Sequence, residues 1–475
     1  MEPTKLFELG FGKTQHQMSD EHLGVKGDIP DWLEGTLIRN GPGTFNVGEA
    51  RYRHWFDGLA MLHKFNLHGG KLRYSNKFLD TSSFRAAQEA GTIVYSEFAT
   101  DPKRTFFQKI QNVFEPMITD SAKVNVAKFG DDYMALAETP IQILFDPETL
   151  ETVGRFSYED RLVGQMTTVH PIFDQKQHLA INLVTHFDAF SHYNFYAVKN
   201  GRDVHKIADV PVRNPAYMHS FGMTQNYLIL TEFPMVVNPI SLLLWLNPYI
   251  ENYDWKPRKG TRITLIDRLT GEIKNRSTTD AFFAFHHINA FEKGSEVIFD
   301  IDAYEDASIL QAYYLDQLKT GKNKIPFGKL RRYFVPLNGG KIRHETISDT
   351  CMELPNFDVS RYNMSGEYRF VYGSSIHPQA PSGFYNQIAK VDLLGKEDAT
   401  WYQEGSYPGE AVFVGRPGRE QEDDGVVLSV VINETDESAF LLILDAHSFT
   451  EIARAEVPNN ILFGYHGAFF PDMSK

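Results

Sequence analysis

The sequence predicts an all-β protein and, among all-β architectures, favours a propeller with inserted loops. Short apolar or alternating runs bounded by Gly, Asp, Asn and Pro recur along the 475 residues, a pattern typical of strands joined by turns. One strand–turn–strand unit recurs in three diverged copies, LFDPETLETVGRF, LIDRLTGEIKNR and LLILDAHSFTEIAR. No long amphipathic helix interrupts these runs, which leaves a sandwich, a barrel or a propeller.

The expected strands follow one another without a change in composition, and diverged copies spread over the whole length favour a propeller. No Pro-, Ser- or Gly-rich linker divides them, so we expect one domain over residues 1–475. Seven blades would use about 68 residues each, more than the ~40–45 of a compact blade, so long inserted loops are expected. The strand runs include DDYMALAETPIQILFD, HLAINLVTH, NYLILTEF, TRITLIDRLTGEI, SEVIFDIDAY, YRFVYGSS and GVVLSVVI.

Two segments break the strand pattern. Residues 105–118, TFFQKIQNVFEPMI, place apolar side chains at helical spacing, and residues 239–255, PISLLLWLNPYIENYDW, form an apolar stretch with aromatic ends. Both fit helices or loops that cap the sheet core, and both fit interfacial segments that dip into a membrane surface. The sequence leaves the two interpretations open. No run approaches the ~20 apolar residues that a transmembrane helix needs.

Composition narrows the class of protein. A formal net charge of -14 argues against a nucleic-acid partner, which calls for a basic surface. The single cysteine, Cys351, excludes internal disulfides and cysteine-based metal sites. The first residues lack a basic segment followed by an apolar one, so we expect a cytoplasmic protein. The N-x-S/T sequons at Asn275, Asn363 and Asn433 are then chance matches.

Four histidines in short apolar runs are the candidate metal ligands. Any one of them, taken alone, is more simply explained as a core histidine with a hydrogen-bond partner. Their distance apart in the sequence means that only the fold could bring them together. Four neutral imidazoles without a carboxylate would make a site different from the common set of two histidines and one carboxylate. They stand in MTTVHPIFD, PAYMHSFGMT, FFAFHHINAFE and ILFGYHGAFF, as His170, His219, His286 and His466.

Three glutamates stand in apolar strand contexts, where a charge without a partner is costly. They are Glu138 in MALAETPI, Glu353 in TCMELPNF and Glu410 in YPGEAVFV. A metal-bound imidazole normally donates its second N–H to a carboxylate or a carbonyl, so it would be a suitable partner. An arginine or the backbone explains each glutamate equally well when it is considered alone.

Further blocks connect these contexts to a known family. They are LEGTLIRNGPGTFNVG (33–48), YRHWFDGLAMLHKF (52–65), YSEFATDP (95–102), EDDGVVLSVV (422–431) and the C-terminal ARAEVPNNILFGYHGAFF. With these blocks and the histidine contexts, the chain resembles the carotenoid cleavage oxygenases nearly end to end, and most of all their animal-type branch. The resemblance implies a seven-bladed β-propeller, with loops and short helices forming a cap over the metal site.

The resemblance also implies a role for particular residues. One Fe(II) per chain would lie on the propeller axis, ligated by the four histidines. The family pattern F-H-x-x-N gives the ligand role in FHHIN to His286 and leaves His287 as a neighbour. His170 would have no carboxylate partner, and Phe98 and Tyr304 would lie near the substrate. The resemblance likewise implies that Glu138, Glu353 and Glu410 orient His219, His286 and His466 respectively.

The reaction implied is cleavage of a carbon–carbon double bond of a carotenoid or apocarotenoid by O2, giving aldehydes, with retinal as the product of a central cut. Such a polyene dissolves in membranes, which favours 239–255 and 105–118 as a peripheral membrane contact at the cavity mouth. The alternatives are a stilbenoid-cleaving dioxygenase, a retinoid isomerase and a non-catalytic propeller. Stilbenoid cleavage needs polar groups that activate a phenol, and no convincing Lys–Tyr pair is evident. The complete set of four histidines and three glutamates argues against a scaffold.

Overall fold

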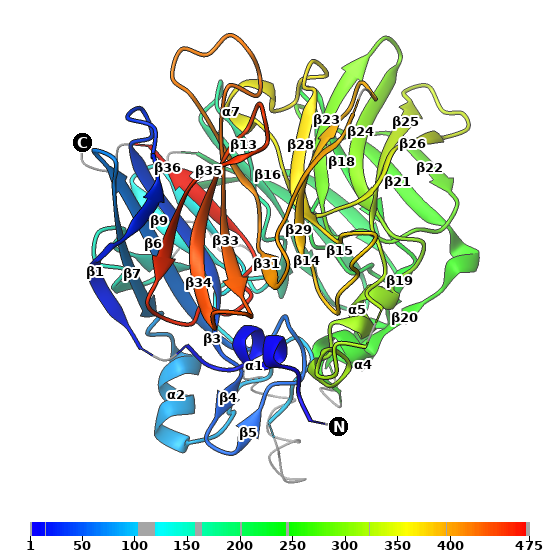
Figure 1. The fold of residues 1–475 in the computed structure, drawn as a ribbon. Helices are drawn as coiled ribbons and strands as arrows, with labels where there is room; N and C mark the ends of the chain where they lie inside the picture. The colour runs from blue at the N-terminus through cyan, green and yellow to red at the C-terminus, as the bar shows by residue number, and fades with distance from the viewer. Residues whose placement is uncertain are drawn as a thin grey trace.

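A computed structural model describes residues 2–14, 16–102, 119–156, 164–199, 202–243, 247–322, 324–395 and 397–471. Within these ranges, seven antiparallel sheets of four to six strands surround one axis (Figure 1). The predicted seven-bladed propeller is therefore confirmed. The blades are numbered here from the one that contains the first long strand.

The first three blades, each given from its outer to its inner edge, are built as follows. Blade 1 is β1 (Met18–Leu23), β7 (Lys71–Phe78), β6 (Leu59–His68), β3 (Gly35–Thr44) and β36 (Gly467–Phe470). Blade 2 is β11 (Thr152–Arg155), β10 (Ile143–Phe145), β9 (Asp132–Leu136) and β8 (Asn125–Phe129). Blade 3 is β16 (Asp203–Val212), β15 (Ser191–Lys199) and β14 (Leu179–His186), which pairs with both β12 (Met166–Thr167) and β13 (Ile172–Asp174).

The remaining blades follow in chain order. Blade 4 is β22 (Ile273–Thr279), β21 (Thr261–Asp267), β18 (Tyr227–Glu232) and β17 (Gly222–Met223). Blade 5 is β26 (Arg343–Cys351), β25 (Lys329–Pro336), β24 (Glu296–Ala303) and β23 (His287–Lys293). Blade 6 is β30 (Ala399–Tyr402), β29 (Gln387–Asp392), β28 (Phe370–Ser375) and β27 (Glu353–Asn356). Blade 7 is β2 (Val25–Gly27), β35 (Glu451–Val457), β34 (Ser438–Asp445) and β33 (Gly425–Asn433), with β31 (Ser406–Pro408) and β32 (Val412–Gly415) on the inside.

The two ends of the chain close the ring. Strand β36, near the C-terminus, pairs with β3 in blade 1 and aligns Ala468 with Ile38. Strand β2, near the N-terminus, pairs with β35 in blade 7 and aligns Val25 with Ala455. Backbone hydrogen bonds between the ends of the chain therefore join the first blade to the last. The inner strand β36 also lies beside β8 and β32 of the neighbouring blades, which brings these edges close to the axis.

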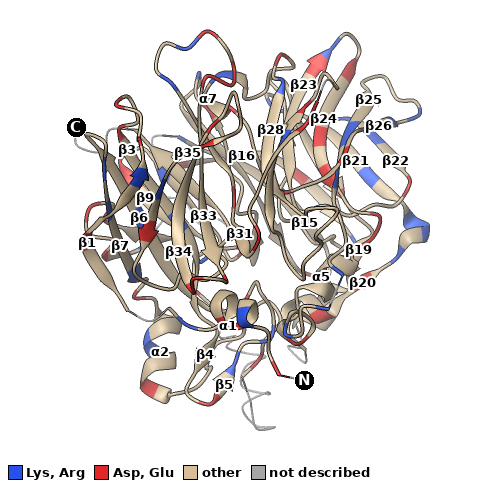
Figure 2. Cartoon of the chain, in the orientation of Figure 1, with Lys and Arg blue, Asp and Glu red and all other residues tan. Residues whose placement is uncertain are grey.

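Apolar side chains fill the space between neighbouring blades. The cluster between blades 1 and 2, for example, contains Ile38 and Leu62 on one side and Val126 and Ala135 on the other, all buried. Burial of such side chains is the main favourable term in folding, at about 25 cal/mol per Å² of apolar surface. Charged residues of both signs lie mainly on outer strands and connecting loops (Figure 2). The inner edges of the packed blades carry few of these charges and can hold a site at the axis.

Loops and short helices cover one face of the propeller, at the bottom of Figure 1. The helix α2 begins at the cap Thr81, whose Oγ1 accepts from the N–H of Phe84, and ends at Gly91 with a φ of 62°. The cap elements are α1 (Lys5–Phe11), β4 (Asn46–Val47), β5 (Ala50–Arg51), α2 (Ser82–Ala90), β19 (Met235–Val237), α4 (Pro239–Leu243), η1 (Tyr249–Asn252), β20 (Tyr253–Trp255), α5 (Ser308–Ala312) and α6 (Leu315–Leu318). The remaining short helices are η2 (Pro257–Lys259) and α7 (Val359–Tyr362).

The two segments that break the strand pattern differ in what the structure shows. Residues 239–255 form α4, η1 and β20 of the cap wherever they are described. Residues 105–118 lie outside the described residues. Among the described helices, none has the length and apolar character needed to cross a bilayer.

Candidate metal centre and its cavity

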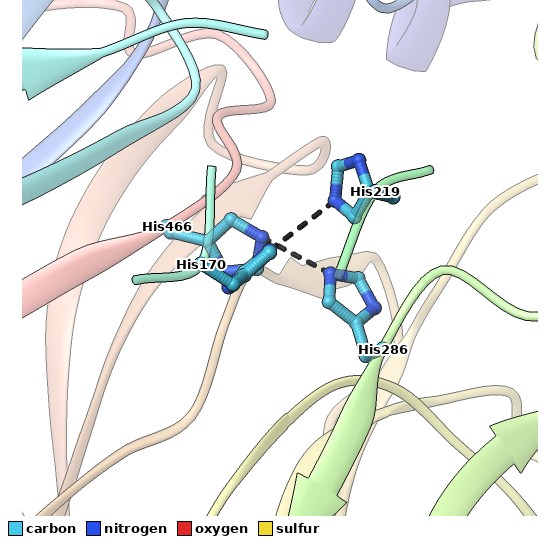
Figure 3. A group of neighbouring side chains, drawn as sticks. All are labelled: His170, His219, His286 and His466. Carbon is cyan, nitrogen blue, oxygen red and sulfur yellow. Dashed lines mark hydrogen bonds between the residues drawn. The ribbon is translucent and has the colours of Figure 1, made fainter. Parts of the chain in front are cut away.

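The structure brings the four predicted histidines together on the propeller axis (Figure 3). Each comes from a different blade, at or just before an inner strand: His170 before β13, His219 before β17, His286 before β23 and His466 before β36. One ring nitrogen from each lies within 4.8 Å of the others. Residues separated by up to 296 positions meet because each blade presents the start of an inner strand to the same point.

The chemistry of this donor set fits a metal cation. The Nε2 atoms of His170 and His219 are 3.2 Å apart, and so are those of His286 and His466. Where Nδ1 carries the proton and donates it to a carboxylate, Nε2 presents a lone pair. Lone pairs that face one another at this distance repel, and a cation between them converts that repulsion into coordination. Neutral imidazole nitrogens are the ligands that iron, zinc and copper accept.

The three glutamates lie behind three of these imidazoles. Nδ1 of His219 is 2.8 Å from Oε1 of Glu138, and Nδ1 of His286 is 2.7 Å from Oε2 of Glu353. Nδ1 of His466 is 2.9 Å from Oε1 of Glu410. Each carboxylate fixes the tautomer and the orientation of its ring, so that Nε2 points to the axis.

The seven residues come from seven different blades. The histidines belong to blades 3, 4, 5 and 1, and the glutamates to blades 2, 6 and 7. Glu353 begins β27, Glu410 lies between β31 and β32, and Glu138 follows β9. Every blade therefore contributes one side chain to the centre. His170 has no carboxylate partner among the described residues.

Each glutamate also accepts a second hydrogen bond, on the other oxygen in Glu353 and Glu410 and on the same oxygen in Glu138. The hydroxyl of Tyr217 donates to Oε1 of Glu138 at 2.5 Å, and that of Tyr304 donates to Oε1 of Glu353 at 2.9 Å. The N–H of Gly467 donates to Oε2 of Glu410 at 2.7 Å. These contacts restrict the carboxylates and, through them, the imidazoles.

The backbone next to Glu353 adopts an uncommon conformation. Leu354 has a φ of 51°, in the left-handed region that non-glycine residues rarely occupy. The N–H of Leu354 donates to Oε2 of Glu353 at 2.6 Å. Such backbone strain persists where the surrounding structure requires it, and here the strained residue also supplies a donor to the carboxylate that holds His286.

Burial favours the neutral form of three of the imidazoles, the form that binds a metal. It lowers the pKa of His466 to about 3 and holds the pKa of His170 well below its ordinary value. It also lowers the pKa of His219, although the hydrogen bond to Glu138 opposes that shift. Burial raises the pKa of Glu410 to about 7. Burial favours a raised pKa for Glu353 as well, but His286 and the hydrogen bonds from Leu354 and Tyr304 together outweigh it, so the pKa of Glu353 is lowered.

The neighbouring histidine has a different role. Nδ1 of His287 lies 2.9 Å from Oγ of Ser220, and its Nε2 lies 2.9 Å from Oγ1 of Thr231. Both ring nitrogens are therefore engaged within the blades. Of the two histidines in FHHIN, it is His286 that faces the axis.

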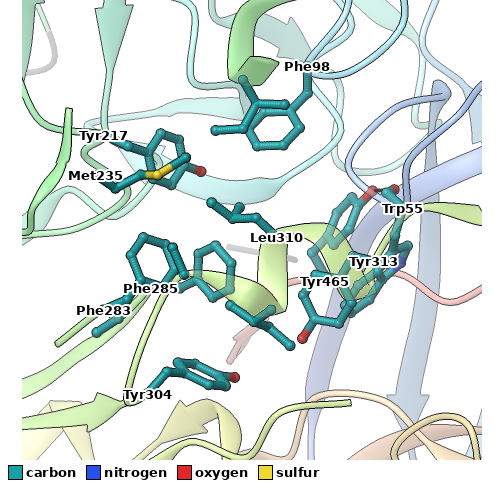
Figure 4. Packing of buried hydrophobic residues seen from close by; sticks show 14 of the residues in the cluster. Trp55, Phe98, Tyr217, Met235, Phe283, Phe285, Tyr304, Leu310, Tyr313 and Tyr465 are labelled. Carbon is teal, nitrogen blue, oxygen red and sulfur yellow. Dashed lines mark hydrogen bonds between the residues drawn. The ribbon is translucent and has the colours of Figure 1, made fainter. Parts of the chain in front are cut away.

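A cavity lies between the cap and the centre, with about 1300 Å³ of atom-free space including its mouth. His219, His286 and His466 form part of its wall, whereas His170 does not. The rest of the wall is largely apolar, and several of its aromatic residues pack against one another (Figure 4). The lining aromatic side chains are Trp55, Phe56, Phe98, Phe187, Tyr249, Phe285, Tyr313 and Tyr465.

The two predicted substrate residues lie in different places. Phe98 lines the cavity and packs against Phe56, with ring centroids 5.3 Å apart. Tyr304 is buried outside the cavity wall and contacts Glu353. Sequence reasoning did not single out Tyr217, nor the buried pair Glu97 and Lys123 in the cavity wall. Glu97 stands beside Phe98 in the YSEFATDP block, and this position was the one sequence feature that could have indicated its place in the cavity wall.

Two of the sequence blocks act as supports for the site. In GTLIRNGPG, the guanidinium of Arg39 donates to the carbonyl of Tyr465 at 3.0 Å, and the N–H of Asn40 donates to the carbonyl of His466 at 2.9 Å. In the FDG block, Asp57 accepts from the N–H of Ala99 at 2.9 Å and from the hydroxyl of Thr100 at 2.6 Å. The blocks thus fix a metal-site loop and the cavity wall.

A comparison with known proteins agrees with this geometry. A family model described as retinal pigment epithelial membrane protein matches residues 11–471. The chain belongs to this family. Its resemblance to the carotenoid oxygenases is confirmed by the relatives found. The β,β-carotene 15,15′-dioxygenases of Mus musculus and Homo sapiens are both 33% identical to it, over 98% of this chain and 92% and 95% of their own lengths.

Other members of the family are similarly distant. The chloroplastic carotenoid cleavage dioxygenase 8 of Arabidopsis thaliana is 32% identical over 98% of this chain and 86% of its own length. Among solved structures, cobalt-substituted Synechocystis apocarotenoid oxygenase superposes with a TM-score of 0.87 at 25% identity, covering 98% of each chain. The propeller is therefore shared with a solved structure that differs at about three quarters of the compared positions.

Proposed function

We propose that this chain is a non-haem iron dioxygenase that cleaves a carbon–carbon double bond of a carotenoid or apocarotenoid with O2. The observation that carries the proposal is the set of four imidazoles, of which the three held by carboxylates line an apolar cavity. The relatives' names support the substrate class. One Fe(II) per chain, held by His170, His219, His286 and His466, would supply the activation of O2.

The reaction needs no further cofactor. One alkene and one O2 give two carbonyl products, so atoms and electrons balance without an external reductant. The residues of the chain bind and orient the reactants. Glu138, Glu353 and Glu410 hold the imidazoles, while the aromatic cavity wall aligns the polyene and excludes water.

The cavity wall supports an apolar substrate. Its lining is mostly apolar and includes Phe98, Phe187 and Phe285, and walls of this kind bind apolar ligands. We propose a polyene for this reason, with retinal as the product if the central bond is cut. We also propose that residues 1–475 form one functional domain, since the centre takes a residue from every blade.

The decisive experiment is product identification. Iron-loaded protein is incubated in air with β-carotene, with apocarotenals of several lengths and with resveratrol, and the products are separated by chromatography. We expect paired carbonyl products from a carotenoid or apocarotenoid, and retinal identifies a central cut. Cleavage of resveratrol with no carotenoid turnover would instead assign the chain to stilbenoid cleavage. The variant His219→Ala is the control for metal-dependent turnover.

We further propose that the cap contacts a membrane surface at the cavity mouth. Leu242 of α4 lines the cavity, together with Asn247 and Tyr249. Ile240 on the same helix is 59% exposed. An apolar mouth at the interface would let a membrane-dissolved substrate enter directly. The other predicted contact, 105–118, stays a prediction.

Liposome co-sedimentation tests the membrane contact. Ile240→Asn is expected to lower binding to vesicles of neutral phospholipid. Leu269→Asn is the matched control, because Leu269 is 94% exposed in the turn between β21 and β22, away from the cap. Equal binding by both variants and the parent protein would contradict the proposed contact.

A further inference from the structure

A buried ion pair lies in the wall of the apolar cavity. The ammonium of Lys123 donates to Oε2 of Glu97 at 2.6 Å, and the side chains are 5% and 1% exposed. The hydroxyl of Thr119 donates to the other oxygen of Glu97, also at 2.6 Å. The carboxylate is therefore satisfied on both oxygens, and all three residues line the cavity.

Lys123 occupies a special position in the propeller. It stands two residues before the inner strand of blade 2, next to Val124, whose carbonyl accepts from the N–H of His466 at 3.1 Å. Blades 1, 4 and 5 place a histidine at or near the equivalent point. Thr119 is linked to the same centre, because its carbonyl accepts from the hydroxyl of Thr139, the residue after Glu138. The pair is thus built on the backbone that supports the metal centre.

The ammonium of Lys123 differs from those of the other buried lysines. An ammonium has three N–H donors. Lys390 gives its donors to the carboxylate of Asp423 and to two backbone carbonyls. Lys64 also has three acceptors, all on residues 147–148. For Lys123, Glu97 is the single acceptor found among the described residues, so the described part of the chain engages one of its three donors.

The pair is costly to maintain in this place. Burial is unfavourable enough to raise the pKa of Glu97 to about 7, even though the adjacent ammonium opposes the shift. Buried ion pairs are often no more stabilising than apolar residues of similar volume. A pair retained in the wall of an otherwise apolar cavity is better explained by recognition than by stability.

We infer that Lys123, positioned by Glu97, binds an oxygen atom of the polyene, so that the preferred substrate carries a hydroxyl or carbonyl group. This inference rests on the proposed function. Glu97 balances the charge of the ammonium, which makes the pair suited to a neutral oxygen acceptor rather than to a carboxylate. Because the pair is fixed to the backbone next to His466, the bound oxygen sets how far the polyene extends past the metal centre. The same contact therefore selects the double bond that is cut.

Binding and turnover together test the inference. β-Carotene, its 3,3′-dihydroxy derivative and an apocarotenal are titrated into metal-free protein, with tryptophan quenching as the readout, since Trp55 lines the cavity. Turnover of each is then measured with iron-loaded protein. The hydroxylated carotenoid and the apocarotenal distinguish a ring hydroxyl from a chain-end carbonyl as the bound group. For each protein, the affinity and the kcat/KM for an oxygenated substrate are divided by the corresponding value for β-carotene. These two ratios are compared between the wild-type protein and the variants.

The key variants are Lys123→Met and the double variant Glu97→Gln with Lys123→Met, which removes both charges. The double variant decides the test if the single variant fails to fold. Lys390→Met is the matched control, since it breaks a buried lysine–carboxylate pair outside the cavity. Losing a hydrogen bond from a charged donor is expected to lower the ratio about tenfold in both Lys123 variants, with no change in the control.

The outcomes separate the two proposals. A wild-type protein that does not prefer an oxygenated polyene, or variants that keep the wild-type ratio, would overturn the role of Lys123 and leave the dioxygenase proposal intact. Absence of turnover of any carotenoid by iron-loaded protein would overturn the proposed function, while the binding ratios in metal-free protein would still test Lys123. A shift of the cleaved bond in the Lys123 variants would support its role in positioning.

Discussion

The four histidines of the centre fall into two groups. His219, His286 and His466 are buried, line the cavity, and are each hydrogen-bonded to a glutamate. His170 is half-buried, lies outside the cavity wall, and has no carboxylate partner in the described part of the chain. Orientation is thus fixed most strongly where the substrate would approach.

The difference between His170 and the other three histidines follows from the number of blades. Seven blades contribute seven side chains, and four histidines leave only three positions for glutamates. Glu353 and Glu410 support histidines in adjacent blades, 5 and 1. Glu138 of blade 2 reaches past blade 3 to His219 of blade 4. Among the residues that the structure describes, His170 of blade 3 is therefore the ligand candidate left without a carboxylate.

Removing an imidazole is expected to have the largest effect. His219→Ala or His466→Ala takes away a nitrogen donor and leaves a glutamate buried without its partner. We expect no stoichiometric iron and no measurable cleavage, with iron measured by plasma mass spectrometry. A protein that kept one iron per chain after either substitution would contradict the proposed ligand set.

Replacing a glutamate should lower iron binding less than removing an imidazole does. It tests the group of histidines that have a carboxylate partner. Glu353→Gln keeps the shape but removes the charge that orients His286, and a loss of about 10–100-fold in iron affinity or activity is expected. The control is Glu232→Gln, since this buried carboxylate pairs with Arg262 away from the cavity wall. If both variants bound iron like the parent protein, orientation by the carboxylates would not matter for the metal.

The tyrosines that hold the glutamates should contribute less. Tyr217→Phe and Tyr304→Phe each remove one hydrogen bond, worth about 1 kcal/mol, or roughly fivefold in iron affinity. Tyr372→Phe is the matched control, because Tyr372 is buried and its hydroxyl has no partner among the described residues. Equal losses in all three variants would show that the effect comes from packing and not from the carboxylates.

A buried histidine outside the metal centre, His63, tests the effect of burial on a histidine that does not bind the metal. Burial lowers the pKa of His63 to about 3, below the ordinary value of about 6.5 in the unfolded chain. Between these values the unfolded state binds more protons, so the free energy of unfolding falls as the pH falls, by up to about 1.4 kcal/mol per pH unit. His63→Gln should reduce this slope in denaturant titrations and leave iron binding unchanged. An unaltered slope would show that His63 is already charged in the folded protein.

The sequence predicted the propeller and singled out the seven residues as candidates, because each stands in a local pattern. The number of blades and the pairing of histidines with glutamates came from the resemblance to a family. Repeated strand–turn–strand units indicated the blades, and a histidine or glutamate inside an apolar run indicated a buried polar group. Tyr217 and Lys123 have no such signal. Their roles depend on partners in other segments: Tyr217 meets Glu138 from another blade, and Lys123 meets Glu97 from the cap connection. Tyr304 was predicted near the substrate but contacts Glu353. Neighbouring residues of a strand point to opposite sides, so a difference of one position decides whether a side chain faces the cavity.

The central claim is that one iron is bound by four neutral histidines, and X-ray absorption at the iron edge of the loaded protein tests it most directly. Ligation by all four histidines predicts one iron per chain with a coordination shell that contains four imidazole nitrogens. A coordination shell dominated by oxygen, or one with fewer than four imidazole nitrogens, would contradict it.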